Sequence, residues 1–158
     1  MDRVTLTVDG RTISANPGQS VLNAALDAGI YIPHLCSHPD LPPQANCKLC
    51  VVEVAGQDGV VCSCELPAIE GMPVVTQSSA LLQRRKVALE LMLAGHPKDC
   101  VSCKRYMNCE LQAMIQYLGT VHSRMRVTSR KTDHLNVDNP LVVREMERCI
   151  QCGPLLKE

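Results

Sequence analysis

The stretch 96-HPKDCVSCKRYMNC-109 decides how the second half of this chain is organised. It reads H-x3-C-x2-C-x5-C and places four soft or borderline metal ligands within fourteen residues. A Cys-x2-Cys pair lets two thiolates reach one metal centre, and the flanking His96 and Cys109 can complete a shell of four ligands. Three thiolates with one imidazole suit either zinc or an iron–sulfur cluster. The sequence therefore predicts a metal centre at this stretch.

The start of the chain predicts a small α+β domain. Residues 4–8 alternate in polarity, Asp9-Gly10 marks a tight turn, and residues 11–15 resume extended structure, which together predict a β-hairpin. Ser20 can cap a helix over residues 21–28. A hairpin followed by a helix suggests a β-grasp-like fold.

A proline-rich loop and three short strands are expected next. Residues 31–46 contain four prolines, which disfavour regular structure. Strands are expected at residues 51–54 and 60–62. A further strand at 71–76 is expected at an edge of the sheet, because Pro73 has no N–H to donate to a neighbouring strand.

Residues 80–94 predict an amphipathic helix that ends at Gly95. One face should be apolar and buried, and the other charged and solvated. The expected apolar face is Leu81, Leu82, Ala88, Leu89, Met92 and Leu93, and the expected charged face is Arg84, Arg85, Lys86 and Glu90. We interpret the basic run 84–86 as solvated surface, the alternative being a docking patch.

Less regular structure is expected towards the end. A helix is predicted over residues 108–118, and residues 120–138 are polar and poorly periodic, which predicts an irregular segment. A short apolar run at 141–143 precedes a last pair, Cys149-x2-Cys152.

A second ligand set lies in the first half of the chain. It reads C-x10-C-x2-C-x13-C and consists of Cys36, Cys47, Cys50 and Cys64. The set keeps the central pair and the distant fourth cysteine of plant-type 2Fe–2S ferredoxins, with a longer first gap. Cys62 competes with Cys64 for the fourth position. Cys64 is favoured because it lies where the strand should end, before Pro67.

Composition limits the function classes. Sixteen basic residues balance sixteen acidic ones, so net charge suggests no nucleic-acid partner. The chain has no Phe or Trp and ten cysteines, which fits small subdomains stiffened by metal centres. We find no apolar signal core and no apolar run of about 18–20 residues, so we expect a cytoplasmic protein without membrane insertion. In the reducing cytosol, clustered cysteines are more often metal ligands than disulfides.

Three segments together carry a resemblance to a known family. They are Cys36-x10-Cys47-Lys48-Leu49-Cys50-Val51-Val52-Glu53-Val54, Cys64-Glu65-Leu66-Pro67 with Gly71-Met72-Pro73-Val74, and His96-Pro97-x-Asp99-Cys100-x2-Cys103-x5-Cys109-Glu110-Leu111-Gln112. The chain resembles the N-terminal iron–sulfur region of iron-only hydrogenases, of the large iron–sulfur subunit of complex I, and of the large subunit of NAD-dependent formate dehydrogenases.

The resemblance implies two cofactors and their ligands. It implies a β-grasp 2Fe–2S ferredoxin domain over residues 1–77, and a linker helix with a small helical 4Fe–4S domain over 78–119. The implied ligands are Cys36, Cys47, Cys50 and Cys64 for the 2Fe–2S cluster and His96, Cys100, Cys103 and Cys109 for the 4Fe–4S cluster. Residues 120–158 would then be an irregular segment and the truncated start of a two-cluster ferredoxin domain.

The sequence departs from the family pattern at two places. The family has a further cysteine three positions after Cys152, where this chain has Leu155, so Cys149 and Cys152 alone cannot complete a normal 4Fe–4S site. We expect a fragment or truncated product, the alternative being a partner chain that supplies the other ligands. Ala45 stands where the family often has glycine, for which we expect only a modest adjustment of the loop.

The expected function is one-electron relay within a multi-cluster oxidoreductase, without a catalytic site in this chain. The resemblance implies partners that are other redox subunits, namely a catalytic subunit and an NAD(P)H-linked flavoprotein. Because His96 is neutral where a thiolate would be charged, it should raise the potential of the second cluster. The alternative function is a zinc-stabilised interaction module without a redox role, although common zinc folds use other spacings.

Overall fold

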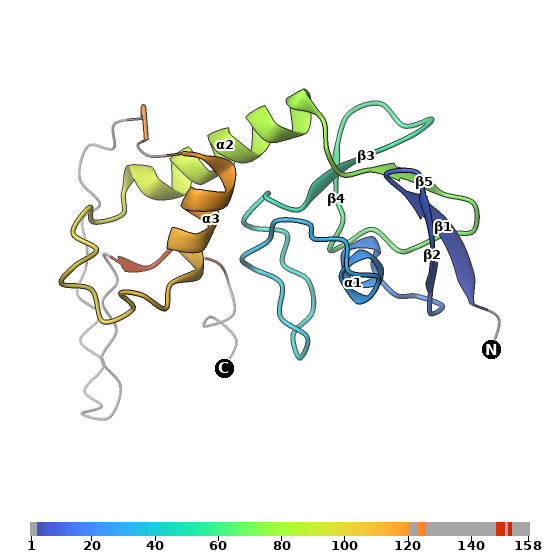
Figure 1. Ribbon diagram of the computed structural model, residues 1–158, viewed down its shortest axis with the longest axis horizontal. Coiled ribbons are helices and arrows are strands. Elements are labelled where there is room, and N and C mark those ends of the chain that lie inside the picture. The colour runs from blue at the N-terminus through green and yellow to red at the C-terminus, as the bar shows by residue number, and fades with distance from the viewer. Residues whose placement is uncertain (1–2, 121–122, 126–147, 151, 153–158) are drawn as a thin grey trace. The chain divides into compact units, whose positions relative to one another are not determined.

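The computed structural model describes residues 3–120, 123–125, 148–150 and 152 (Figure 1). The chain divides into two compact units, one formed by Met1–Ala88 with Cys152–Glu158 and the other by Leu89–Gln151. This division falls within helix α2 (Ser79–Ala94). The predicted domain limits at 77 and 119 stay predictions.

The first unit begins with the predicted hairpin. β1 (Val4–Val8) pairs antiparallel with β2 (Arg11–Ala15), with Val8 opposite Arg11 at the turn. Asp9 and Gly10 have φ angles of 49° and 80°, the pair of positive values that a type I′ turn requires. The Asp9 carboxylate also accepts a 2.7 Å bond from the backbone N–H of Thr76 and a second bond from its hydroxyl. The turn is thereby tied to the end of β5 (Pro73–Val75).

The sheet is mixed, in the order β2-β1-β5-β3-β4, with β3 at Val51–Val54 and β4 at Val61–Cys62. β5 runs parallel to β1 and antiparallel to β3, so the prediction that it lies at an edge is wrong. Pro73 is tolerated in the interior because it is the first residue of the strand, where its missing N–H interrupts no ladder. Its carbonyl still accepts a 3.1 Å bond from the N–H of Ala55.

Helix α1 (Val21–Asp27) covers this sheet and confirms the predicted helix. Ser20 caps it by accepting a 3.3 Å bond from the N–H of Asn23. The buried residues of α1 join the inward residues of the hairpin in one apolar core, which includes Leu6, Val8, Ile13, Ala15, Val21, Leu22, Ala24 and Ala25. Between α1 and β3, residues 31–46 form neither helix nor strand, as predicted.

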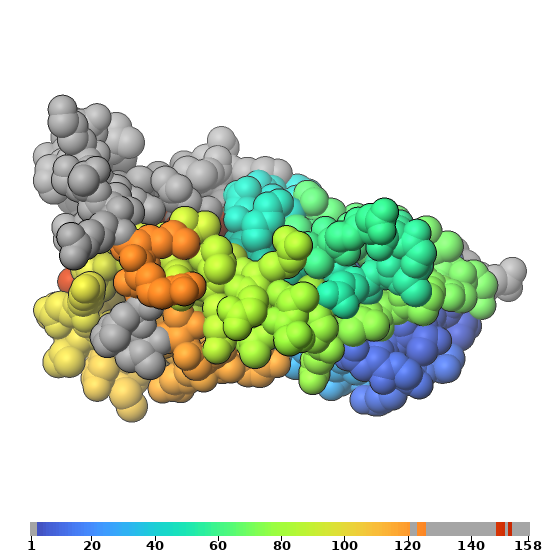
Figure 2. Space-filling view, turned by 90° about the horizontal axis from the view of Figure 1, so that it is seen from above, coloured from blue at the N-terminus to red at the C-terminus, as the bar shows by residue number. Residues whose placement is uncertain are grey.

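Helix α2 does not have the predicted faces. Leu81 and Leu89 are buried as expected, but Leu82 is 40% exposed. Arg85 and Glu90, expected in solvent, are only 5% and 6% exposed. Both charges have polar partners: Arg85 donates to backbone carbonyls, and Glu90 accepts from Arg124. Part of α2 still reaches the surface, as the yellow-green atoms of Figure 2 show.

The second unit contains the end of α2 and helix α3 (Glu110–Leu118), which confirms the predicted second helix. Gly119 ends α3 in the left-handed region, with a φ of 61°. The predicted irregular segment 120–138 and the apolar run 141–143 lie outside the described residues, apart from residues 120 and 123–125. Within the described part of the chain, none of the helices has the length and apolar character needed to span a membrane.

Candidate metal centres

The first ligand set converges in the first unit. Cys36 lies in the loop after α1, Cys47 and Cys50 precede β3, and Cys64 follows β4. All four side chains are buried. Residues up to 28 apart in the sequence are therefore brought to one place by the loop and two strand ends.

The four thiols interact in two pairs. The Cys36 thiol donates to Cys47 Sγ across 3.3 Å, which lowers the pKa of Cys47 to about 5 and raises the pKa of Cys36. A hydrogen bond between Cys64 and Cys50 lowers the pKa of Cys50 to about 6 and raises the pKa of Cys64. The pairs also repel across the site, since negative charge on Cys47 raises the pKa of Cys50 and charge on Cys36 raises that of Cys64. All four sulfurs thus share one electrostatic environment.

Backbone N–H groups point at these sulfurs. Hydrogen bonds from the backbone of Asn46 and Cys47 act to lower the pKa of Cys36, and one from Leu49 acts likewise on Cys47. Lys48, inside the Cys-x2-Cys pair, has a φ of 53°, and such left-handed residues turn successive N–H groups towards an anion. Thiolate sulfur that accepts N–H bonds is the environment that iron–sulfur clusters use.

Ala45 also lies in the left-handed region, with a φ of 47°. A glycine adopts this conformation without the steric penalty that a Cβ brings. The position where the family often has glycine is therefore one that requires a positive φ, and this chain adopts it with alanine. The Ala45 methyl packs in the core of the first unit, which offsets part of that penalty.

Cys62 is half-buried and faces different partners from Cys64. Its sulfur lies 3.9 Å from the ammonium of Lys48, and burial raises the pKa of its thiol. It sits opposite Val51 in the β3–β4 ladder, whereas Cys64 lies beyond the strand and bonds to Cys50. This geometry supports Cys64 as the fourth ligand, which stays a prediction.

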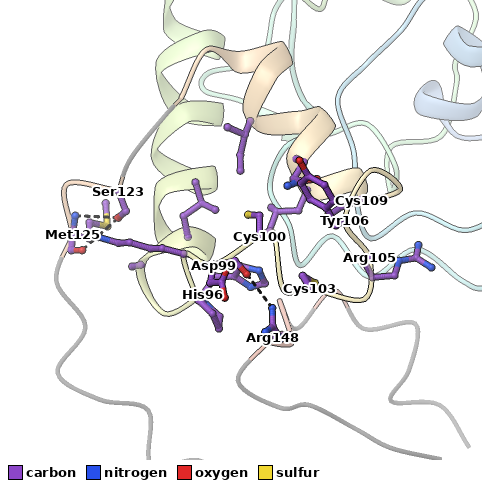
Figure 3. A pocket seen from close by; sticks show the side chains of 17 residues that line it. His96, Asp99, Cys100, Cys103, Arg105, Tyr106, Cys109, Ser123, Met125 and Arg148 are labelled. Carbon is purple, nitrogen blue, oxygen red and sulfur yellow. Dashed lines mark hydrogen bonds between the residues drawn. The ribbon is translucent and has the colours of Figure 1, made fainter.

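The second ligand set lines one cavity of about 520 Å³ in the second unit. Figure 3 shows His96, Cys100, Cys103 and Cys109 around it, with the end of α2 and the start of α3 nearby. His96 lies two residues after α2, and Cys109 is the residue that precedes α3. Cys109 stands at the N-cap position of α3, but its side chain makes no capping bond to the helix.

The loop between these ligands is braced by its own polar groups. Ser102 donates its backbone N–H to Asp99 Oδ1 at 3.3 Å and its hydroxyl to the other carboxylate oxygen. These bonds lower the pKa of Asp99. Arg148 reaches the same loop, with 3.4 Å bonds to the Asp99 carbonyl and to Ser102 Oγ. The contacts by which Asp99, Ser102 and Arg148 brace this loop were not predicted from the sequence.

Both donor sets have the chemistry that an iron–sulfur cluster needs. The first set offers four buried thiols in two interacting pairs, and the second offers three thiols and one imidazole around a cavity. All ten cysteines lie in the described part of the chain, and none is in a disulfide. Cys149 and Cys152 are half-buried, and the prediction that they lack a complete ligand set is not tested.

Two family models match the chain in succession. Residues 1–79 match the 2Fe-2S iron-sulfur cluster binding domain. Residues 85–124 match the NADH-ubiquinone oxidoreductase-G iron-sulfur binding region. The first model covers the loop and strands that carry the four-cysteine set, and the second covers the stretch with the histidine and three cysteines.

Similar proteins include subunits of NADH-ubiquinone oxidoreductase and of a hydrogenase. The chain is 36% identical to the mitochondrial NADH-ubiquinone oxidoreductase 78 kDa subunit of Candida albicans, covering 94% of this chain and 21% of that subunit. It is also 36% identical to the NADP-reducing hydrogenase subunit HndD of Solidesulfovibrio fructosivorans, covering 96% of this chain and 27% of that subunit. The chain thus spans between a fifth and a third of the length of these relatives.

A solved structure shows the same fold. A chain of an NAD+-reducing [NiFe]-hydrogenase, in the H2-reduced state, matches with a TM-score of 0.81 and 38% identity. The match covers 96% of this chain and 63% of that one. Together with the family models, this shows that the chain belongs to the 2Fe–2S iron–sulfur cluster binding domain family, followed by the 4Fe–4S binding region shared by complex I and hydrogenase subunits.

Proposed function

We propose that the two ligand sets hold one cluster each and that the chain relays single electrons through them. The proposed ligands of the 2Fe–2S cluster are Cys36, Cys47, Cys50 and Cys64. Those of the 4Fe–4S cluster are His96, Cys100, Cys103 and Cys109. The clusters supply the redox chemistry, and the chain supplies their ligands, burial and hydrogen bonds.

The pairing of the four buried thiols is the observation that carries this proposal. A 2Fe–2S cluster has two irons, each of which takes two cysteine thiolates. The contacts between Cys36 and Cys47 and between Cys50 and Cys64 provide two such pairs. The N–H groups that face the sulfurs stabilise the negative charge that these ligands carry.

The partners are redox subunits of a larger oxidoreductase. The similar proteins are named as subunits that act on NADH or NADP, and the matching solved chain comes from a hydrogenase that reduces NAD+. We propose that a flavoprotein subunit linked to NAD(P)H exchanges electrons with this chain and that a separate catalytic subunit carries out the substrate reaction. The hydrogen, formate and NADH enzymes of the family are all compatible with this relay.

Metal and sulfide analysis after anaerobic purification tests the proposal. We expect about six irons and six sulfides per chain, the sum for one 2Fe–2S and one 4Fe–4S cluster, with little zinc. About two zincs without sulfide, persisting after reconstitution with iron and sulfide, would instead establish the zinc-stabilised interaction module.

A further inference from the structure

The buried guanidinium of Arg85 on α2 donates hydrogen bonds to the main chain on both sides of Cys50. Arg85 Nε donates to the carbonyl of Leu49 at 2.9 Å, and Arg85 Nη2 donates to the carbonyl of Val51 at 2.7 Å. Arginine is rarely buried without partners, and its planar fork fits two acceptors held at a fixed spacing. These two acceptors belong to the residues immediately before and after a proposed cluster ligand.

The carbonyl of Cys50, between these two, is hydrogen-bonded by Ser63. The Cys50 carbonyl accepts a 3.0 Å bond from the backbone N–H of Ser63 and a 2.7 Å bond from its hydroxyl. Three successive buried carbonyls are therefore satisfied, the outer two by Arg85 and the middle one by Ser63. An unpartnered buried carbonyl is costly, so this segment of the main chain is closely fixed.

Through Leu49, Arg85 is also connected to Cys47, the other cysteine of the Cys-x2-Cys pair. Leu49, whose carbonyl Arg85 holds, donates its own N–H to the sulfur of Cys47. Leu49 is also fully buried, so it has little freedom to move. A displacement of the Leu49 carbonyl would therefore move an N–H donor at Cys47 as well as the main chain at Cys50.

The start of α2 is hydrogen-bonded to β3, and this contact helps to place Arg85 next to the carbonyls that it binds. The Ser78 hydroxyl accepts a 3.1 Å bond from the N–H of Leu81 and donates a 2.9 Å bond to Glu53 Oε1 on β3. The helix is thus tied to β3 at its cap and, two turns later, to the residues at the beginning of β3 through Arg85. Neither contact depends on the second unit.

The positive charge of Arg85 should stabilise the reduced, more negative state of the proposed 2Fe–2S cluster. Two ferric ions, two sulfides and four thiolates sum to two negative charges, and gaining one electron from a redox partner gives three, without any bond being formed or broken. A fixed cation in a poorly solvated place stabilises the more negative state. A guanidinium stays protonated, so its charge is constant at all working pH values.

We infer that Arg85 is a positioning residue for the Cys47-x2-Cys50 pair and that its charge raises the reduction potential of the 2Fe–2S cluster. This inference rests on the proposed ligation by those cysteines. The neighbouring Arg84 has the same charge on the same helix but is exposed to solvent, which makes it a matched control.

The test compares midpoint potentials in the full chain, by redox titration of the 2Fe–2S electron paramagnetic resonance signal. The variants are Arg85→Gln, which removes the charge, Arg85→Lys, which keeps it, and Arg84→Gln as the control. We expect the lowest midpoint potential in Arg85→Gln and a smaller decrease in Arg85→Lys, whose ammonium keeps the charge but cannot hold both carbonyls. Arg84→Gln should keep the wild-type potential. A potential in an assembled Arg85→Gln variant that equals or exceeds that of Arg84→Gln would overturn the inference.

If Arg85→Gln does not retain its 2Fe–2S cluster, its midpoint potential cannot be measured, and the cluster content of the other variants tests the inference. In that case Arg85→Lys and Arg84→Gln decide. A 2Fe–2S signal retained in Arg85→Lys would support a role for the charge, and a loss that Arg84→Gln does not share would support positioning by the planar fork. Loss of the cluster in Arg84→Gln as well would overturn the inference. A wild-type chain that lacks a 2Fe–2S signal would refute the proposed function, and the inference with it. Wild-type potentials in all assembled variants would refute the inference alone.

Discussion

Replacing Cys64 by serine should remove one cluster, whereas the same replacement at Cys62 should leave both in place. Cys64 is buried and bonded to Cys50, which places it in one of the two thiol pairs. Cys62 lies two residues earlier, half-buried, with its sulfur near Lys48. Each substitution exchanges one sulfur for one oxygen, so the two variants differ only in the position of the lost thiol.

The expected size of the effect follows from the cluster stoichiometry. Loss of the 2Fe–2S cluster removes two of about six irons and two of about six sulfides, so Cys64→Ser should retain about four of each and Cys62→Ser about six. Iron and sulfide assays, with the electron paramagnetic resonance signal of the reduced protein, measure both quantities. Retention of six irons by Cys64→Ser, with loss of two in Cys62→Ser, would refute the assignment. If both single variants keep six, the double variant shows whether either thiol can serve.

Three further predictions concern the second cluster and the packing. His96→Cys should lower the midpoint potential of the 4Fe–4S cluster, because a thiolate replaces a neutral imidazole; an unchanged or higher potential in redox titration would contradict this. Leu22→Ala should destabilise the first unit by about 2–5 kcal/mol in chemical denaturation, because Leu22 is fully buried, whereas the partly exposed Leu82→Ala should change stability by about 0.5 kcal/mol. Glu90→Gln should destabilise the second unit by about 1 kcal/mol, since it weakens two 3.1 Å contacts with the largely exposed Arg124; an unchanged denaturation midpoint would show that this ion pair contributes nothing.

Local signals were sufficient to predict the hairpin, α1 and α3. The turn at Asp9-Gly10 needs two positive φ angles, which these residue types accept readily, and both residues adopt them. Ser20 and Gly119 mark helix ends through chemistry that depends only on neighbouring residues. The two candidate ligand sets could be proposed for a similar reason, because cysteines and histidine grouped around a Cys-x2-Cys pair have few other uses. Their roles as ligands stay predictions.

The place of β5 in the sheet could not be predicted from the same kind of signal. Pro73 disfavours a central strand only if its missing N–H would interrupt a ladder, and this depends on which residue begins the strand. Pro73 is that first residue, so β5 can lie between β1 and β3. Strand order is a long-range property, and a single proline does not determine it.

Helix α2 shows why buried charge is the hardest feature to read from a sequence. Periodicity predicts a charged face in solvent, yet Arg85 and Glu90 are both buried, each with partners far away in the sequence. Arg85 binds carbonyls beside the first ligand set, and Glu90 binds Arg124 in the second unit. Local patterning tends to fail where a residue is retained for a specific interaction rather than for the helix itself. The unexpected burial of Arg85 therefore points to the Cys-x2-Cys pair, where its charge would act on the proposed 2Fe–2S cluster.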